Sequence, residues 1–433
     1  EGLSNAGEMG TNLIIVVNDN EMSIAENHGG LYQNLKELRD TEGRSSCNFF
    51  RSLGLDYLYV GEGNDIPSLI AAFAKVKDTS RPTVVHIHTQ KGKGYAPAEA
   101  DREEFHWEMP FDLETGKPKV DCSGMEDYHS LTGKFLLEKM KEDHTVVAIS
   151  SGTPTVIGFT PERRKQAGRQ FVDVGIAEEH AVALASGIAA GGGRPVYGVY
   201  STFIQRCYDQ LSQDLCINGN PAVITVFMGT VAGMNDVTHL GFFDIPLISN
   251  IPNMVYLAPT CSEEYFAMLE WAVRQTEYPV AIRVPGAAVV HRKEEFDTDY
   301  SELNRYKMTA RGETVAILAL GAFYDLGQAL KNKLREESGV EATLINPRYI
   351  TGLDEPMLEE LKVGHRIVVT LEDGVLDGGF GEKIARYYGN SEMRVLNYGL
   401  RKEFADRYNL DELMKANRLT DKQMAEDIAG ILE

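Results

Sequence analysis

Short apolar runs alternate with amphipathic stretches of helical length along most of the chain. Runs typical of strands that are buried on both faces lie at residues 13–17, 84–88, 145–150, 196–200, 222–227, 314–320 and 366–372. Segments with helical periodicity or an Ala-rich face lie at residues 67–78, 130–142, 178–190 and 324–337. This alternation predicts βαβ units and an α/β fold with mainly parallel sheets.

The pattern divides into three blocks, which predict three domains. Residues 1–120 form the first block and end in a stretch rich in Pro, Gly and acidic residues, 109–124, which reads as a linker. Residues 125–298 form the second block, and residues 305–433 repeat its strand–helix alternation. A chain of 433 residues is long enough for each domain to have its own core.

The composition narrows the class of protein. A hydrophobic content of 43% and a charged content of 25% are typical of a soluble globular protein. The net charge of −21, with no basic block, argues against a nucleic-acid partner. No apolar run approaches the length of a membrane span and no signal peptide is evident, so neither membrane insertion nor secretion is predicted. The scattered cysteines, never in a CxxC pair, favour a reducing compartment, and we expect a cytoplasmic protein; they are Cys47, Cys122, Cys207, Cys216 and Cys261.

The first residues read as the end of a motif. EGLSNAG resembles the tail of a helix that ends at Gly7 and leads almost directly into a strand. We therefore expect that an N-terminal segment is missing from this chain or is supplied by another polypeptide.

Two adjacent carboxylates, Glu178 and Glu179, stand at the head of an otherwise apolar helical segment. The neighbours of Glu178 on its helical face are Ala181, Val182 and Ala185. A carboxylate in such a place is costly unless it has a partner. The alternative to a buried carboxylate with a functional partner is an ordinary acidic residue in the first helical turn, which the helix dipole favours.

Polar residues follow the strands of the first block, where parallel α/β sheets bind their ligands. The segment from Asn18 to Met22 offers amide and carboxylate oxygens suited to Mg²⁺, although a turn built from Asn and Asp looks the same. In the segment 90–95, Lys91 or Lys93 could meet a phosphate, or the segment could be a solvated loop. His106 lies beside Trp107, where a lone His is more often a packed loop residue than a catalyst.

In the second block, Tyr200, Phe203 and Arg206 follow the strand 196–200. Phe203 could belong to the core or could form a platform for a flat ring. A long loop, 228–244, follows the strand 222–227 and contains His239, which could be a proton donor or a loop hydrogen-bonder.

Taken together, these segments resemble the thiamine-diphosphate enzymes of the transketolase superfamily and, within it, the 1-deoxy-D-xylulose-5-phosphate synthase family. The matching segments are NDNEMSIAEN, QKGKGYAPAEAD, FHWEMPFD, VDVGIAEEHAVALASGIAAGG, VYSTFIQRCYDQ, THLGFFD and LEDGVLDGGFGEKIA. The resemblance implies that residues 1–120 are the C-terminal part of a pyrophosphate-binding domain. It also implies a pyrimidine-binding domain, a transketolase C-terminal domain and a homodimer.

The resemblance also implies roles for the residues that match. Glu178 would hydrogen-bond the pyrimidine of thiamine diphosphate, Phe203 would stack on it and Ile176 would pack near it. Asn20 and the carbonyl of Met22 would hold Mg²⁺, and Lys91 would lie near the diphosphate. The substrate channel would be lined by His106, Tyr200, Arg206 and His239. Glu179 stands where relatives usually carry Gln, so we assign it no catalytic role.

The implied reaction is decarboxylation of pyruvate and transfer of the two-carbon unit to glyceraldehyde 3-phosphate, but the chain departs from the family pattern. The GDG motif that supplies a further Mg²⁺ ligand is absent. Met228 and Gly286 occupy positions where arginines that hold the acceptor phosphate are expected, while Arg283 remains. The DG pair of the long loop is shifted to Asn235-Asp236. A transketolase-like or other 2-oxoacid-utilising carboligase with another acceptor, and an inactive scaffold, therefore stay open as alternatives.

Overall fold

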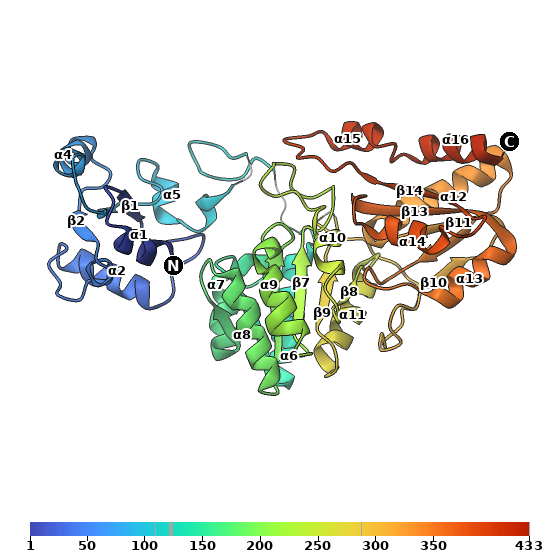
Figure 1. Ribbon diagram of the computed structural model, residues 1–433, viewed down its shortest axis with the longest axis horizontal. Helices are drawn as coiled ribbons and strands as arrows, with labels where there is room; N and C mark the ends of the chain where they lie inside the picture. Colours follow the sequence, from blue (N-terminus) through green and yellow to red (C-terminus); the bar gives the residue numbers. More distant parts are fainter. Residues whose placement is uncertain (109, 121–123, 287, 433) are drawn as a thin grey trace. The chain divides into compact units, whose positions relative to one another are not determined.

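The computed structural model describes residues 1–108, 110–120, 124–286 and 288–432 (Figure 1). Cys122 and part of the predicted linker 109–124 lie outside the described residues. The chain forms two compact units, which are described separately below. The first unit contains residues 1–125 and 173–176, and the second contains residues 126–172 and 177–433.

The first unit is built on a three-stranded parallel sheet with the order β1-β3-β2, formed by Ile14–Asp19, Thr83–His88 and Asp56–Val60. Its helices are α1 (Gly2–Met9), α2 (Gly30–Asp40), α3 (Phe49–Ser52), α4 (Ile66–Val76) and α5 (Ala96–Ala100). One apolar cluster joins α1, α2 and α3 to the sheet, and a second joins α4 to it. The sheet thus has a separate apolar cluster for each of two groups of helices.

Two details of the first unit differ from the sequence prediction. Helix α1 continues past Gly7 to Met9 and ends at Gly10, whose positive φ of 61° suits a helix C-cap. Strand β1 is only partly buried, and Val16 is 47% exposed. β1 pairs with β3 alone among the described strands, and an edge strand has fewer neighbours to cover its side chains.

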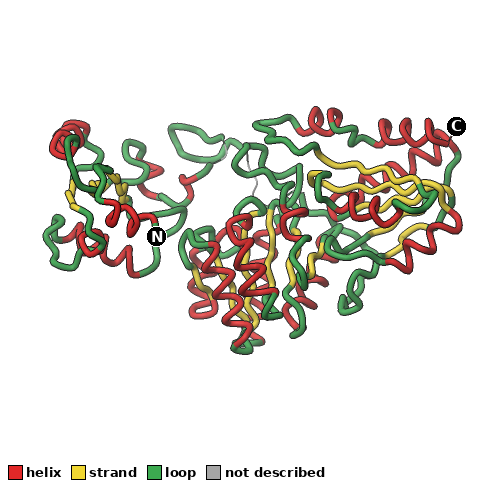
Figure 2. The backbone as a smooth tube through the Cα atoms, viewed as in Figure 1, coloured by secondary structure: helices red, strands yellow, loops and turns green. Residues whose placement is uncertain are grey.

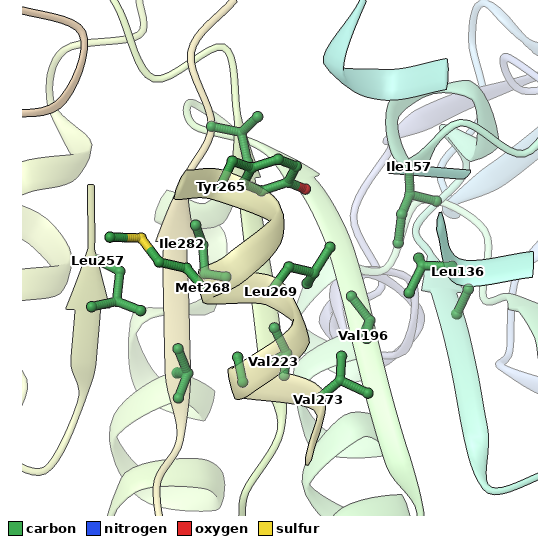
Figure 3. Close-up of a cluster of buried hydrophobic side chains, with 14 of the residues drawn as sticks. Leu136, Ile157, Val196, Val223, Leu257, Tyr265, Met268, Leu269, Val273 and Ile282 are labelled. Carbon is green, nitrogen blue, oxygen red and sulfur yellow. The ribbon is translucent and has the colours of Figure 1, made fainter. Parts of the chain in front are cut away.

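The second unit contains a six-stranded sheet with the order β5-β4-β6-β7-β9-β8. Its strands are β4 (Val146–Ser150), β5 (Phe171–Asp173), β6 (Arg194–Tyr200), β7 (Val223–Phe227), β8 (Val255–Leu257) and β9 (Val280–Arg283). The helices around it are α6 (Tyr128–Glu142), α7 (Pro161–Ala167), α8 (Glu178–Ala190), α10 (Asp244–Ser249) and α11 (Ser262–Arg274). Figure 3 shows part of the core, where Met268 and Leu269 of α11 face strand residues such as Ile282.

The same unit contains a five-stranded sheet with the order β10-β12-β11-β13-β14. Its strands are β10 (Lys307–Ala310), β11 (Thr314–Ala319), β12 (Thr343–Asn346), β13 (His365–Val375) and β14 (Arg394–Leu400). Helices flank these strands: α12 (Tyr324–Ser338), α13 (Glu355–Gly364), α14 (Phe380–Tyr388), α15 (Leu410–Ala416) and α16 (Asp421–Leu432) (Figure 2). β10 is antiparallel to β12, and the other pairs of this sheet are parallel.

The predicted α/β fold with mainly parallel sheets is confirmed, and the three sheets fall in the three predicted blocks. The boundaries of three separate domains stay a prediction. The segment after β6 consists of a 3₁₀ turn (Ile204–Cys207), the short α9 (Tyr208–Gln210) and a π-helical stretch (Leu211–Cys216). Within the described ranges, no helix has the length and apolar character that a membrane crossing requires.

Candidate functional site

Glu178 is the first residue of α8, and its side chain is only 4% exposed. Arg206, from the 3₁₀ turn after β6, donates from Nη1 to Oε2 of Glu178 at 2.8 Å. The buried carboxylate thus has the charged partner that its burial demands. Its other oxygen, Oε1, accepts no hydrogen bond from any residue that the structure describes, so it is free to meet a donor.

Three predicted site residues of the second unit form an aromatic cluster. Tyr200 ends β6, Phe203 lies in the turn that follows, and His239 lies in the loop after β7. The ring of Phe203 is 5.5 Å from that of Tyr200 and 5.4 Å from that of His239, both edge-on. The carboxyl ends of the parallel strands β6 and β7 are neighbours in the sheet, which brings these distant residues together.

His239 is oriented by its own loop. Its Nδ1 lies 3.1 Å from Oδ1 of Asp236 and 2.7 Å from the hydroxyl oxygen of Thr238. These contacts leave Nε2 as the ring nitrogen that can exchange a proton with a ligand. The pKa of the neighbouring Tyr200 phenol is raised by burial, so this hydroxyl stays protonated at neutral pH and can donate a hydrogen bond.

Arg283 is placed differently from its predicted role in binding substrate. Its side chain is 3% exposed and sits between two buried carboxylates. Nε donates to Asp244 at 2.7 Å, Nη1 donates to Asp373, and Nη2 donates to the carbonyl of Gly241 at 3.0 Å. Burial opposes its charge, but Asp244 and Asp373 outweigh burial and raise the pKa of Arg283. The donors of Arg283 are engaged inside the unit, so its assignment as a substrate ligand stays a prediction that this arrangement does not support.

The two positions where the family pattern expects arginines lie against each other. A Cβ added to Gly286 would lie 2.3 Å from Sδ and 3.0 Å from Cε of Met228. Met228 follows β7 directly and has a positive φ of 58°. The Met228 thioether therefore occupies the space beside residue 286, and neither position carries a cation.

In the first unit, the segment after β1 forms the predicted turn and also meets Lys91. The Met22 amide donates to Oδ1 of Asn20 at 3.0 Å, as in a turn built on Asn. Nζ of Lys91 donates to the carbonyls of Ser23 at 2.8 Å and Ile24 at 3.3 Å. Lys91 thus contacts the segment that follows Asn20 and Met22, and the assignment of these three residues to a metal and a diphosphate stays a prediction.

His106 belongs to the same neighbourhood. Its pKa is lowered by burial and then by the positive charge of Lys91. The pKa of Lys91 is itself lowered by burial. No cluster of three or more His, Cys, Asp or Glu ligands occurs among the described residues, and the predicted Mg²⁺ ligands, an amide and a carbonyl, are of another kind.

Sequence reasoning missed the ion-pair cluster beneath this segment. Asp19 is buried and receives hydrogen bonds from Arg39 and, at 2.9 Å, from Nε2 of His86. Burial alone would raise the pKa of Asp19, but His86 and Arg39 lower it to about 2. A signal was present, because His86 lies within one predicted strand and Asp19 closely follows another. Ile176, the remaining predicted residue, belongs to the first unit and is 53% exposed.

Comparison with known proteins identifies the family. The family model of 1-deoxy-D-xylulose-5-phosphate synthase matches residues 1–47, the transketolase pyrimidine-binding domain matches residues 126–289, and the transketolase C-terminal domain matches residues 305–424. The 1-deoxy-D-xylulose-5-phosphate synthase of Lachnoclostridium phytofermentans is 33% identical over 98% of this chain and 74% of its own length. The chain belongs to the 1-deoxy-D-xylulose-5-phosphate synthase family. The enzyme of the same name from Clostridium tetani is 32% identical over the whole of this chain and 75% of its own length.

Solved structures agree on the fold of this family member. A Pichia stipitis transketolase in complex with sedoheptulose 7-phosphate superimposes with a TM-score of 0.59, at 15% identity, over 99% of this chain and 74% of its own. A split-gene transketolase, described as an inactive β4 tetramer, superimposes with a TM-score of 0.60 at 21% identity, over 70% of this chain and 96% of its own. Both show that the 1-deoxy-D-xylulose-5-phosphate synthase family member has a transketolase-like fold.

Proposed function

We propose that this chain is a thiamine-diphosphate-dependent transferase that decarboxylates pyruvate and joins the remaining two-carbon unit to glyceraldehyde 3-phosphate. The product would be 1-deoxy-D-xylulose 5-phosphate. Membership of the synthase family supports this reaction. The observation that carries the proposal is Glu178, a buried carboxylate with one oxygen held by Arg206 and one oxygen free, in the pyrimidine-binding domain.

The residues of the second unit fit the aminopyrimidine of thiamine diphosphate. Oε1 of Glu178 can accept a hydrogen bond from a ring nitrogen, and Phe203 offers an aromatic face beside Tyr200 and His239. When bound, thiamine diphosphate supplies the nucleophilic carbon and the electron sink for decarboxylation. In the first unit we assign Mg²⁺ to Asn20 and the Met22 carbonyl, and the diphosphate to the vicinity of Lys91.

The chain's own residues would bind and orient the cofactor and substrate, and would move protons. Glu178 would share a proton between its free oxygen and the ring nitrogen of the cofactor. His239 would exchange a proton at Nε2 while Asp236 holds Nδ1. Tyr200 would donate its hydroxyl hydrogen to a substrate oxygen, and His106 would serve as a second proton-exchanging group. Phe203 would exclude water from one side of the site.

The proposal is tested by measuring pyruvate consumption and product mass with thiamine diphosphate, Mg²⁺ and glyceraldehyde 3-phosphate. We expect Glu178→Gln to lower kcat by on the order of a hundredfold or more, because it removes a group that holds the transferred proton. Glu360→Gln, at an exposed ion pair of α13, is the matched control and should retain activity. Equal activity of the two variants would remove Glu178 from the mechanism, and absence of turnover in the unaltered chain would favour an inactive scaffold.

A second candidate function is carboligation to an acceptor that carries no phosphate. The observation that favours it is that both arginines predicted to bind substrate, Arg206 and Arg283, form ion pairs with carboxylates of this chain. Carboxylates neutralise Arg206 and Arg283, and Met228 and Gly286 carry no charge. The ratio of kcat/KM for glyceraldehyde to that for glyceraldehyde 3-phosphate distinguishes the two, and a ratio above one would favour this candidate.

We further infer a homodimer in the cytoplasm. Support comes from the family resemblance and from β1, which exposes Val16 at the edge of its sheet. Light scattering of the purified chain tests the dimer. Isothermal titration with thiamine diphosphate and Mg²⁺ tests whether the chain binds its cofactor without another polypeptide.

A further inference from the structure

Arg206 joins two adjacent carboxylates rather than one. Nη1 donates to Oε2 of Glu178 at 2.8 Å, and Nη2 donates to Oε1 of Glu179 at 3.0 Å. The three side chains differ in exposure: Glu178 is 4% exposed, Glu179 is 39% exposed and Arg206 is 46% exposed. We call this arrangement the Arg206 bridge.

The bridge depends on the shape of a guanidinium group. Consecutive helical residues point in different directions, so the carboxylates of Glu178 and Glu179 do not face each other. A planar fork with two nitrogen ends can contact both, whereas an ammonium group is a single point charge. Glu179 therefore fixes one end of the fork, and this leaves the other end directed at Glu178.

Glu178 depends on this contact for its charge compensation. A buried carboxylate without a partner is strongly disfavoured. Arg206 is the cation that contacts it within the described part of the chain. The other neighbours, Cys207 and Tyr197, are neutral: burial, followed by the charges of Glu178 and Glu179, raises the pKa of the Cys207 thiol to about 12. The Tyr197 hydroxyl is within 2.8 Å of the Ser151 hydroxyl instead.

We propose that Glu179 is a positioning residue, which holds Arg206 against Oε2 of Glu178 and so keeps Oε1 aimed at the cofactor ring. This assigns Glu179 a role that the sequence prediction withheld. It also makes Arg206 a support of Glu178 rather than a ligand of the substrate. The consequence for cofactor binding rests on the proposed function, while the bridge itself does not.

The test compares thiamine diphosphate affinity, by titration calorimetry with Mg²⁺, across four variants of the full chain. Glu179→Ala removes the anchor, and Glu179→Gln retains an oxygen that can accept from Nη2. Arg206→Lys retains the charge and loses the fork. Glu360→Ala, which breaks an exposed Arg–Glu pair at 2.7 Å, is the control.

We expect Glu179→Ala and Arg206→Lys each to weaken binding by on the order of tenfold, as loss of a supporting residue behind a ligand does. Glu179→Gln should stay within about threefold of the unaltered chain because its amide oxygen still accepts from the fork. The KM for pyruvate at saturating cofactor should not change in any of them. The proposal is overturned if Glu179→Ala binds like the control. It is also overturned if Arg206→Lys raises the KM for pyruvate and leaves cofactor affinity unchanged.

A cofactor-free measurement separates the bridge from the proposed function. In urea unfolding, the effect of Glu179→Ala on the midpoint should disappear in an Arg206→Met background, because the two residues act through one contact. Additive effects of the two substitutions would overturn the bridge. A chain that shows this coupling but binds no thiamine diphosphate would retain the bridge and refute the proposed function.

Discussion

The Met228 thioether lies against the backbone of Gly286, so that a Cβ at residue 286 would be 2.3 Å from Sδ. Residue 228 follows β7 and residue 286 follows β9, which are neighbouring strands of one sheet. The two positions that depart from the family pattern therefore share one packing contact.

This contact predicts that Gly286→Ala destabilises the second unit. The new methyl group would displace the Met228 side chain, and such overpacking costs about 1–3 kcal/mol. Met228→Ala should remove most of that cost in the double variant, because it vacates the space. Urea unfolding of the two single variants and the double variant measures the coupling, and independent effects would contradict the packing described here.

The buried ion pairs of Arg283 predict a large loss of stability in Arg283→Met. The substitution would leave Asp244 and Asp373 buried without a cation, which costs about 3–5 kcal/mol. Arg311→Met, at an exposed ion pair with Glu360, should cost less than about 1 kcal/mol. Unfolding in denaturant, monitored by circular dichroism, compares the two variants. A small cost for Arg283→Met, together with a raised KM for the aldehyde, would instead support its predicted role as a substrate ligand.

Asp19 predicts that the first unit loses stability in acid. His86 and Arg39 hold its pKa at about 2 in the folded state, below the usual 3.8. The folded state therefore binds this proton more weakly than the unfolded state, and the stabilisation of about 2 kcal/mol is present above about pH 4. It is lost as the pH falls toward about 2. Hydrogen exchange of β1 and β3 between about pH 5 and pH 3 should show this loss, and Asp19→Asn should reduce the pH dependence.

Glu372 predicts the opposite dependence of stability on pH near neutrality. Its carboxylate is buried in β13 and accepts hydrogen bonds from the amides of Phe380 and Gly381 at the start of α14. Burial raises its pKa to about 7, although these amides oppose the shift. The folded state thus binds this proton more tightly, so its contribution to stability falls as the pH rises from about 5 to 7.

Unfolding midpoints between about pH 5 and pH 8 test this slope. Glu372→Gln should flatten the dependence because the amide cannot ionise. The pH dependence of Glu360→Gln should match that of the unaltered chain. If the Glu372→Gln variant retains the full slope, another group is responsible for the titration.

Much of the fold could be predicted because its signals are local. The apolar runs that became β4, β6, β7, β11 and β13 are continuous in sequence, and each of these strands lies between two neighbours in its sheet. The helix that begins at Glu178 was predicted from its apolar face, and the structure starts α8 at that residue. The exposure of β1 could not be predicted in this way, because a run such as Ile14–Val17 does not say which strands pair beside it.

Residue types and their order by themselves determined the fold class, the family and the chemical character of the site. The tertiary structure alone decided which charges meet. It pairs Arg206 with Glu178 and Glu179. It also places Arg283 between Asp244 and Asp373, and Asp19 between Arg39 and His86. These partners lie 20 to 90 residues apart along the chain. The sequence position of a charged residue does not show which residue it pairs with. The pairing follows from the packing of the strands and helices that carry the charged residues.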